Sequence, residues 1–267
     1  MDSLNLARAI RREALKMVHN AGASHIGSAL SIADILAVLY QDILNVSAVS
    51  VGDRNRDRFI LSKGHACVAL YAVLAELGFF EKSLLDEYGR ENSILMNHIS
   101  HKVPGVEFST GALGHGLPFG VGKALSAKIN KEAWRTLVLA SDGEMQEGSN
   151  WEAIMFAAHH RLDNLTLIID HNNLQSLTTV VDTLNIQPLR QKLVAFGWEV
   201  REVDGHCHFE LLEGFRPKMT GAEKPLAVIA NTVKGRGVDF MENSVEWHYK
   251  SPNEEELASA LMQIANA

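Results

Sequence analysis

The chain has 267 residues, of which 46% are apolar, and its formal net charge is −7 at pH 7. This is enough apolar sequence for one large domain with its own core, so we expect residues 1–267 to form a single domain. The acidic balance and the lack of a basic run argue against nucleic acid or an anionic membrane surface as a partner.

Targeting signals and cysteines give a consistent expectation about location. The first residues lack the basic and apolar regions of a signal peptide. The sequence contains no apolar stretch of about 18 residues that could span a bilayer. Cys67 and Cys207 lie far apart without a metal-binding spacing, which predicts free thiols in a reducing compartment. We therefore expect a cytoplasmic protein without a membrane span.

The first half of the chain reads mainly as helix. Apolar residues at helical spacing predict a helix over residues 2–20. A second helix is expected from Ser31, whose side chain would cap it against Asp34, to about Leu44. A short strand follows at 57–61. Further on we expect a helix over 66–77, irregular structure over 89–111 and a helix over 117–129.

The second half alternates strands and helices. Apolar runs at 136–140 and 165–169 predict strands buried on both faces. Between them we expect a helix that ends near Arg161, with Ser149 as N-cap and Glu152 in a capping box. The remaining expected elements are a helix at 188–196, strands at 198–203 and 226–230, a helix at 209–216 and a last helix that begins at 251–254, with Ser251 as its N-cap and Pro252 at its first position. This alternation predicts an α/β fold with a doubly wound, mostly parallel sheet flanked by helices.

Two polar residues follow two of these strands directly. Asp142 comes after the strand at 136–140, and Asn172 after the strand at 165–169. The carboxyl ends of parallel strands lie at one edge of the sheet, where open α/β folds bind ligands. A carboxylate and an amide oxygen form part of a set that suits Mg²⁺, which often completes its coordination with phosphate oxygens and water. An Asp-Gly turn and an Asn at a strand end are also common without any ligand.

Histidine is the other conspicuous residue, with twelve in the chain. Four lie in loops rich in small residues: His25, His65, His98 and His248. Imidazole donates to phosphate or hydroxyl oxygens and transfers protons near neutral pH. A zinc site is the competing interpretation, but no close His/Cys pair has the expected spacing. We expect most of the others to be surface residues or hydrogen-bonded core residues; these are His19, His159, His160, His171, His206 and His208.

The stretch 141–174 resembles the thiamine diphosphate motif, a Gly-Asp-Gly followed about thirty residues later by Asn. The neighbouring residues 144–148 resemble the transketolase family in particular. Ser141 replaces the first glycine of the motif, and residues 176–178 depart from the Ile-Asp-Gly that is usual in the family. The resemblance implies a thiamine diphosphate-binding fold of the diphosphate-binding (PP) type. It also implies that Mg²⁺ is held by Asp142, Asn172 and the Leu174 carbonyl, with the Gly143 N–H on the diphosphate.

The same resemblance assigns roles to the four histidines and to a glycine-rich loop. Residues 62–66 match the family's Ser-Asn/Lys-Gly-His-Ala closely, whereas residues 24–27 and 97–99 match its other histidine motifs less closely. The resemblance implies that His65 and His248 contact the diphosphate and the sugar, and that His25 and His98 bind donor hydroxyls and assist proton transfer. His101 is a second candidate for the role of His98. Other implied cofactor contacts are Gly111, Leu113 and Gly114 beside the aminopyrimidine and Glu147 at the subunit contact.

The resemblance covers only the diphosphate-binding third of a full transketolase. The resemblance does not extend to the pyrimidine-binding domain, whose Glu protonates the aminopyrimidine, or to the C-terminal domain, and we therefore expect both to be absent from this chain. The chain therefore resembles the N-terminal subunit of a split transketolase. Its implied partner is a C-terminal, pyrimidine-binding subunit, and the implied assembly is a heterotetramer. The implied reaction is transfer of a two-carbon ketol unit from a ketose (phosphate) to an aldose (phosphate), with thiamine diphosphate and Mg²⁺ as cofactors.

Two other functions remain open. One is a subunit of a different thiamine diphosphate-dependent ketol- or acyl-transfer enzyme, acting on another sugar or a 2-oxo acid. The other is a non-catalytic paralogue that only binds a partner, which would have no affinity for thiamine diphosphate even in the complex.

Overall fold

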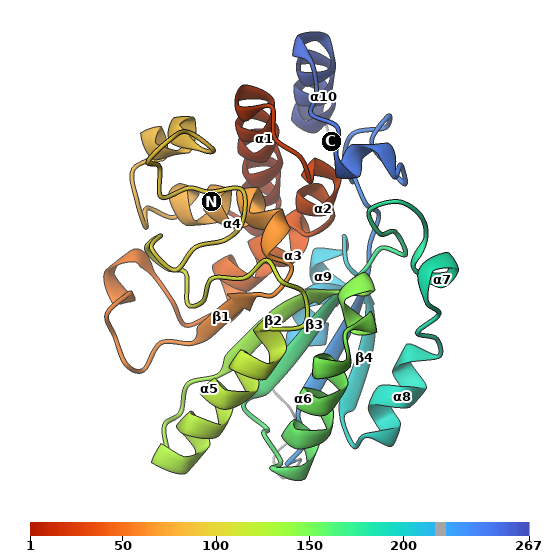
Figure 1. The fold of residues 1–267 in the computed structure, drawn as a ribbon. Helices are drawn as coiled ribbons and strands as arrows, with labels where there is room; N and C mark the ends of the chain where they lie inside the picture. The colour runs from red at the N-terminus through yellow and green to blue at the C-terminus, as the bar shows by residue number, and fades with distance from the viewer. Residues whose placement is uncertain (217–222, 267) are drawn as a thin grey trace.

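The computed structural model describes residues 1–216 and 223–266 (Figure 1). Within these residues, five strands form one sheet in the order β1-β2-β3-β5-β4, and every neighbouring pair is parallel. The expected parallel α/β sheet is thus confirmed. The strands are β1 (Arg58–Leu61), β2 (Thr136–Ser141), β3 (Leu165–His171), β4 (Glu199–Asp204) and β5 (Leu226–Asn231).

Helices cover both faces of the sheet, as Figure 1 shows. The α-helices are α1 (Ser3–Ala21), α2 (Ile26–Ser31), α3 (Ala33–Val38), α4 (Cys67–Glu76), α5 (Gly116–Asn130), α6 (Gly148–His159), α7 (Val180–Thr183), α8 (Leu189–Ala195), α9 (His208–Phe215) and α10 (Glu254–Asn266). Short 3₁₀ segments lie at Ala48–Ser50, Gly64–Ala66, Lys82–Glu87, Gly143–Gln146 and Glu246–His248, and a π-helical turn lies at Leu39–Ile43. Neighbouring side chains of one strand point to opposite faces. Leu137 and Leu139 therefore pack with α1 and α4 in one core, whereas Val138 and Ala140 pack with α5 and α6 in the other.

The central strands are apolar because both of their faces are covered. All five residues at 136–140 and those at 226–230 are buried, as expected for parallel strands between two helical layers. β4 lies at the edge of the sheet and is only partly buried, which explains its mixed polar sequence.

Three expected helix starts are wrong for the same physical reason. The second helical segment begins at Ile26, after His25 in a left-handed conformation (φ 73°), and not at Ser31. The Ser31 hydroxyl donates instead to the carboxylate of Asp170, 2.7 Å away on β3. A serine next to a helix looks like a cap in the sequence, but here its hydroxyl has a distant buried partner.

The other two serines behave in the same way. α6 begins at Gly148 with Glu147 as N-cap, and the Ser149 hydroxyl donates to the carbonyl of Gly114 at 2.7 Å. The last helix is capped by Asn253, which exchanges hydrogen bonds with Glu256 in a capping box. The Ser251 hydroxyl donates to the Val18 carbonyl at 3.0 Å.

The structure can be compared with the expectations about a membrane span and about the cysteines. In the part of the chain that is described, no helix is long and apolar enough to cross a membrane. Cys67 and Cys207 are both free thiols, as expected.

Candidate functional site

The loops after four strands meet at one edge of the sheet. They follow β1, β2, β3 and β5 and carry His65, Asp142, Asn172 and Lys234 respectively. Because the four strands are parallel and adjacent, their carboxyl ends lie side by side. Here the structure has a cavity of about 250 Å³, to which the start of α2 and His248 at the end of the Glu246–His248 turn also contribute.

The four singled-out histidines all line this cavity. The ring centroid of His25 is 5.2 Å from that of His65, 5.9 Å from that of His98 and 4.9 Å from that of His248. The backbones of His25 and His248 are also in contact, because the His25 N–H donates to the His248 carbonyl at 2.7 Å. Segments from four parts of the chain thus form one cluster of imidazoles.

Burial keeps the imidazoles of His25, His65 and His248 neutral at pH 7. The pKa of His25 is lowered to about 4, first by burial and then by His98, Lys234 and Lys63. Burial, followed by Lys234, lowers the pKa of His248 to about 3. Burial also holds the pKa of His65 well below its usual value, with Lys63 as the next cause. A neutral imidazole both accepts and donates a hydrogen bond, as proton transfer to and from a hydroxyl requires.

Asp142 and Asn172 lie together, as their strand ends predicted. The Asp142 carboxylate accepts from the N–H of Gly143 at 2.8 Å and from that of Asn173 at 2.6 Å. Burial and Asp170 raise the pKa of Asp142 to about 6, whereas its bond from the Asn173 N–H lowers it. Asn172 lines the cavity with Leu174 and Gly143.

This oxygen set fits a magnesium diphosphate. The described residues contain no group of three His, Cys, Asp or Glu side chains that could hold a metal alone. One carboxylate, one amide oxygen and one carbonyl suit an ion that takes its remaining ligands from phosphate and water. A buried carboxylate with a raised pKa is also stabilised by a cation nearby. Asp142, Asn172 and Leu174 would hold the ion here.

Two buried lysines belong to the site, although neither was singled out in the sequence. Lys63 is 1% exposed, lines the cavity and forms an ion pair with Asp170. Lys234 also lines it and donates from Nζ to the carbonyls of Leu174 and Gln175, at 3.3 and 2.9 Å. Each lysine lies two or three residues after a buried strand. This position in the sequence would have indicated that both lysines lie at the carboxyl edge of the sheet.

The glycine-rich loop 111–116 reaches the cavity only in part. Gly111 and Leu113 line it. A Cβ on Gly111 would lie 3.1 Å from the His98 ring, so a glycine allows this imidazole to approach. Gly114 lies outside, where its N–H donates to Glu144 at 2.8 Å.

Several singled-out residues do not line the cavity. Glu147 is exposed at the start of α6, and Asp142 is buried beneath the lining. His101 is exposed and bonds to Ser109 through Nδ1, so of the two candidates only His98 lies at the cavity.

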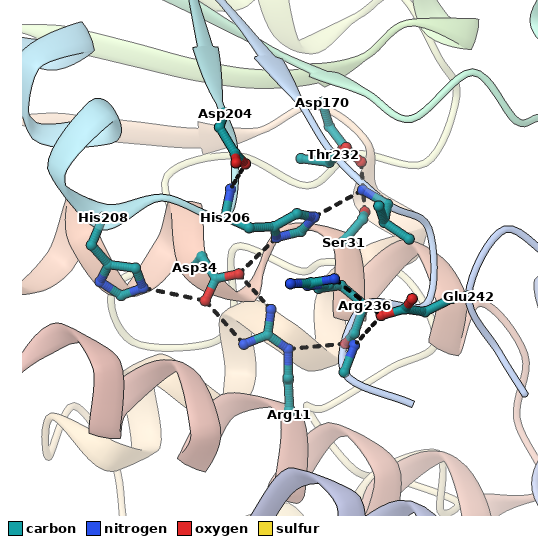
Figure 2. A network of polar contacts seen from close by, with 12 residues as sticks. Arg11, Ser31, Asp34, Asp170, Asp204, His206, His208, Thr232, Arg236 and Glu242 are labelled. Atoms are coloured by element: carbon teal, nitrogen blue, oxygen red, sulfur yellow. Dashed lines mark hydrogen bonds and ion pairs between the residues drawn. The ribbon is translucent and has the colours of Figure 1, made fainter. Parts of the chain in front are cut away.

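Two of the histidines that we expected to be surface residues or hydrogen-bonded core residues take part in a network around a buried carboxylate. His206 and His208 both contact the carboxylate of Asp34, at 2.8 and 3.2 Å, and Arg11 pairs with the same carboxylate (Figure 2). Their partners lie about 170 positions away in the chain, so local sequence contains no sign of this network.

Comparison with known proteins identifies the family. The family model "Transketolase, thiamine diphosphate binding domain" matches residues 3–265. The chain is 43% identical over 263 residues to an apulose-4-phosphate transketolase subunit of Actinobacillus succinogenes, covering 97% of this chain and 94% of that one. It is 40% identical over 255 residues to the protein of the same name from Phocaeicola vulgatus, covering 96% and 91%. The 6-deoxy-6-sulfo-D-fructose transketolase subunit SqwG of a Clostridium species is 34% identical over 265 residues, covering 99% and 96%.

Solved structures agree with this assignment. Transketolase from Campylobacter jejuni is 32% identical with a TM-score of 0.90, and covers 98% of this chain but 42% of its own. Transketolase from Leishmania mexicana is 27% identical with a TM-score of 0.91, covering 99% and 41%. The chain thus spans about two fifths of the length of these enzymes. It belongs to the transketolase family, as a transketolase-type transferase subunit that contains the thiamine diphosphate-binding domain.

Proposed function

We propose that residues 1–267 form one diphosphate-binding domain, which becomes catalytic when a second polypeptide supplies the pyrimidine-binding domain. The observation that best supports this proposal is the cluster of four imidazoles at one cavity, beside the oxygen set of Asp142, Asn172 and Leu174. Asp142 would hold Mg²⁺, and the bound thiamine diphosphate would supply the electron sink for cleaving a carbon–carbon bond. The two proteins would form a heterotetramer in the cytoplasm.

In this proposal the residues of the chain divide into two groups. Lys63, Lys234 and His65 surround the diphosphate, where positive charge and an N–H donor suit an anion. Gly143 borders it, but its N–H donates to the Asp142 carboxylate. The imidazoles of His25, His98 and His248 face the reacting sugar, donate to its hydroxyls and move the proton that leaves or joins an oxygen as the ketol unit is transferred. Gly111 and Leu113 border the aminopyrimidine, and Glu147 meets the second subunit.

An apolar groove beside the cavity supports the need for a partner. It lies between α5 and α6, has a volume of about 470 Å³ and is lined mainly by apolar residues, among them Pro118, Leu125 and Phe156. Gly114 lines this groove and Leu113 lines the cavity, so the two are adjacent. Phe156 is 42% exposed. We propose that the pyrimidine-binding subunit covers this groove.

The substrate end of the cavity suggests what else the partner provides. None of the described residues that line the cavity is an arginine, although arginine is the side chain best suited to bidentate phosphate recognition. We propose that the sugar's anionic tail, where it has one, is bound by the partner subunit.

The test is an activity and binding assay on this chain with and without the polypeptide encoded beside it. Thiamine diphosphate and Mg²⁺ are present, and ribose 5-phosphate is the acceptor. The donors are xylulose 5-phosphate, apulose 4-phosphate and 6-deoxy-6-sulfofructose, the last two taken from the names of the relatives. Ketol transfer only in the mixture supports the proposal. Turnover of a 2-oxo acid in place of a ketose contradicts it, and a mixture that does not bind the cofactor indicates a non-catalytic paralogue.

A further inference from the structure

Lys234 joins three segments of the candidate site. Its Nζ donates to the carbonyls of Leu174 and Gln175 and to Nδ1 of His248, the last at 2.9 Å. Its side-chain stem packs on Gly27, where a Cβ would lie 3.3 Å from the lysine Cγ. The ammonium group is therefore placed at the cavity by the backbone position of the loop that follows β5.

A chain of buried and part-buried side chains, none of which lines the cavity, also holds this loop (Figure 2). The Val233 N–H donates to Nε2 of His206 at 2.8 Å. Because Nε2 accepts, the ring proton is on Nδ1, which donates to the Asp34 carboxylate at 2.8 Å. Arg11 pairs with that carboxylate through both terminal nitrogens, and its Nε donates to the Arg236 carbonyl at 3.1 Å.

The two backbone contacts flank the lysine. Val233 precedes Lys234 directly, and Arg236 follows it by two positions. The chain Arg11–Asp34–His206 thus makes hydrogen bonds to the loop on both sides of Lys234. These three residues come from α1, α3 and the turn after β4, so the contact links the loop to the helical layer that covers one face of the sheet.

The three side chains do not touch the cavity themselves. None of them lines the space around the four histidines. They border a separate hollow of about 210 Å³, and Arg11 and Asp34 are both more than nine-tenths buried. A buried bidentate pair has little freedom to move, so a defined loop geometry follows from this chain of contacts.

We propose that Arg11, Asp34 and His206 are positioning residues that set the affinity for thiamine diphosphate through Lys234. The proposal rests on the proposed function, because it requires Lys234 to face the diphosphate. The effect passes from the carboxylate through the imidazole to the Val233 amide, and from the guanidinium to the Arg236 carbonyl. It requires no contact between these three residues and the cofactor.

Two variants of His206 separate its two hydrogen bonds. The amide of asparagine reaches the position of ring Nδ1, so His206→Asn keeps the bond to Asp34 and loses the acceptor for Val233. The amide of glutamine reaches the position of Nε2, so His206→Gln restores that acceptor. His208→Asn is the matched control, because the His208 ring bonds to Asp34 through Nε2 and to Ser3 through Nδ1, away from the loop that follows β5.

The measurement is the dissociation constant of thiamine diphosphate, with Mg²⁺ present, for the complex with the partner subunit. We expect His206→Asn to weaken binding about tenfold, the size of one hydrogen bond. His206→Gln regains the acceptor but lacks the bond to Asp34, so its loss should be smaller than that of His206→Asn. His208→Asn should stay within about twofold of the unchanged protein. Unchanged binding in His206→Asn overturns the proposal. An equal loss in His208→Asn also overturns it, because the effect would then come from the Asp34 cluster as a whole.

A double-mutant cycle tests the route through the lysine. In the Lys234→Ala background, His206→Asn should cause no further loss of affinity, because the group that it positions is absent. The same factor in both backgrounds indicates a general structural effect and overturns the proposal. Should His206→Asn fail to fold, Arg11→Lys repeats the cycle, since lysine keeps a charge beside Asp34 but lacks the Nε–H that binds the Arg236 carbonyl.

The result is separable from that of the proposed function. If the complex with the unchanged chain does not bind thiamine diphosphate, the proposed function fails and this inference fails with it. If that complex binds the cofactor and the cycle is additive, the proposed function stands and only the positioning role is overturned.

Discussion

The imidazole rings of His25 and His248 meet edge to face with their centroids 4.9 Å apart. The two residues come from opposite ends of the chain, and each is held close to a buried lysine that helps to lower its pKa. A pair of neutral imidazoles at the centre of the cavity, next to one another, is suited to passing a proton between substrate hydroxyls.

This pair predicts a pH dependence of stability. The unfolded chain binds protons at both histidines as the pH falls below about 6.5, whereas the folded chain does so only near 4 and 3. The free energy of unfolding therefore falls between pH 6.5 and 4. Asp142, whose pKa is raised to about 6, acts in the opposite direction below that pH. We compare the unchanged chain with His25→Asn/His248→Asn, in which the Tm should fall less between pH 7 and 5. An equal fall in both contradicts the assignment.

Asp142 predicts a metal requirement. Asp142→Asn keeps the shape of the side chain but removes the carboxylate of the oxygen set. We expect Mg²⁺-dependent binding of thiamine diphosphate to weaken by more than about a hundredfold. Loss of a group that only orients a metal ligand lowers metal affinity by up to about a hundredfold, and loss of the ligand itself should lower it further. Titration of the mixed complex with the cofactor, with Mg²⁺ and with EDTA, measures the effect. Unchanged affinity would remove Asp142 from the metal site. Asp163→Asn, on the surface after α6, serves as the control.

His98 and His101 form a matched pair, since only the first lies at the cavity. We expect His98→Ala to lower kcat/KM for the ketose donor about a hundredfold, through loss of a hydroxyl contact and a proton-transfer group. His101→Ala should stay within about twofold of the unchanged protein. Steady-state kinetics of the mixed complex gives both values. The reverse order would mean that the sugar binds elsewhere.

Two glycines of α5 predict opposite changes in stability. A Cβ on Gly120 would lie 2.4 Å from a methyl of Val138, whereas a Cβ on Gly122 meets nothing within 4 Å. Gly120→Ala should lower the free energy of unfolding by about 1–3 kcal/mol. Gly122→Ala should raise it by about 0.5–1 kcal/mol, the helix propensity of alanine over glycine. Urea denaturation of this chain alone measures both. Equal effects would contradict the packing of α5 on β2.

Phe156 predicts where the partner binds. Phe156→Asp adds a charge to the apolar groove between α5 and α6, and a desolvated charge at an interface opposes association. We expect this variant to bind the pyrimidine-binding subunit more weakly, by at least about tenfold. Met262→Asp, on the exposed side of α10, is the control and should leave assembly unchanged. Sedimentation of the mixed proteins measures the association. Equal behaviour of the two variants would place the interface elsewhere.

Local sequence was sufficient to predict the strands of the sheet and many residues that line the candidate site. The strands were predictable because an apolar run buried on both faces has a distinct pattern. Asp142 and Asn172 were predictable because their place just after a strand sets the edge of the sheet on which they lie. His25, His65, His98 and His248 stood out because each lies in a loop rich in small residues. All four line one cavity.

The tertiary structure decided where polar side chains find their partners. Ser31, Ser149 and Ser251 look like helix caps, but their hydroxyls bind carboxylate or carbonyl groups from other parts of the chain. A hydrogen bond depends on the distance between two groups in the folded structure. The spacing of residues in the sequence therefore predicts only the hydrogen bonds between residues that are close together in the sequence. The ion pair of Lys63 with Asp170 and the hydrogen bond of His206 with Asp34 each join residues more than a hundred positions distant in the sequence. Arg11 and Asp34 are nearer in the sequence, but they too come from different helices. The sequence therefore determined which elements form and which strand ends meet, and folding alone determined the buried contacts that hold Lys234 at the cavity.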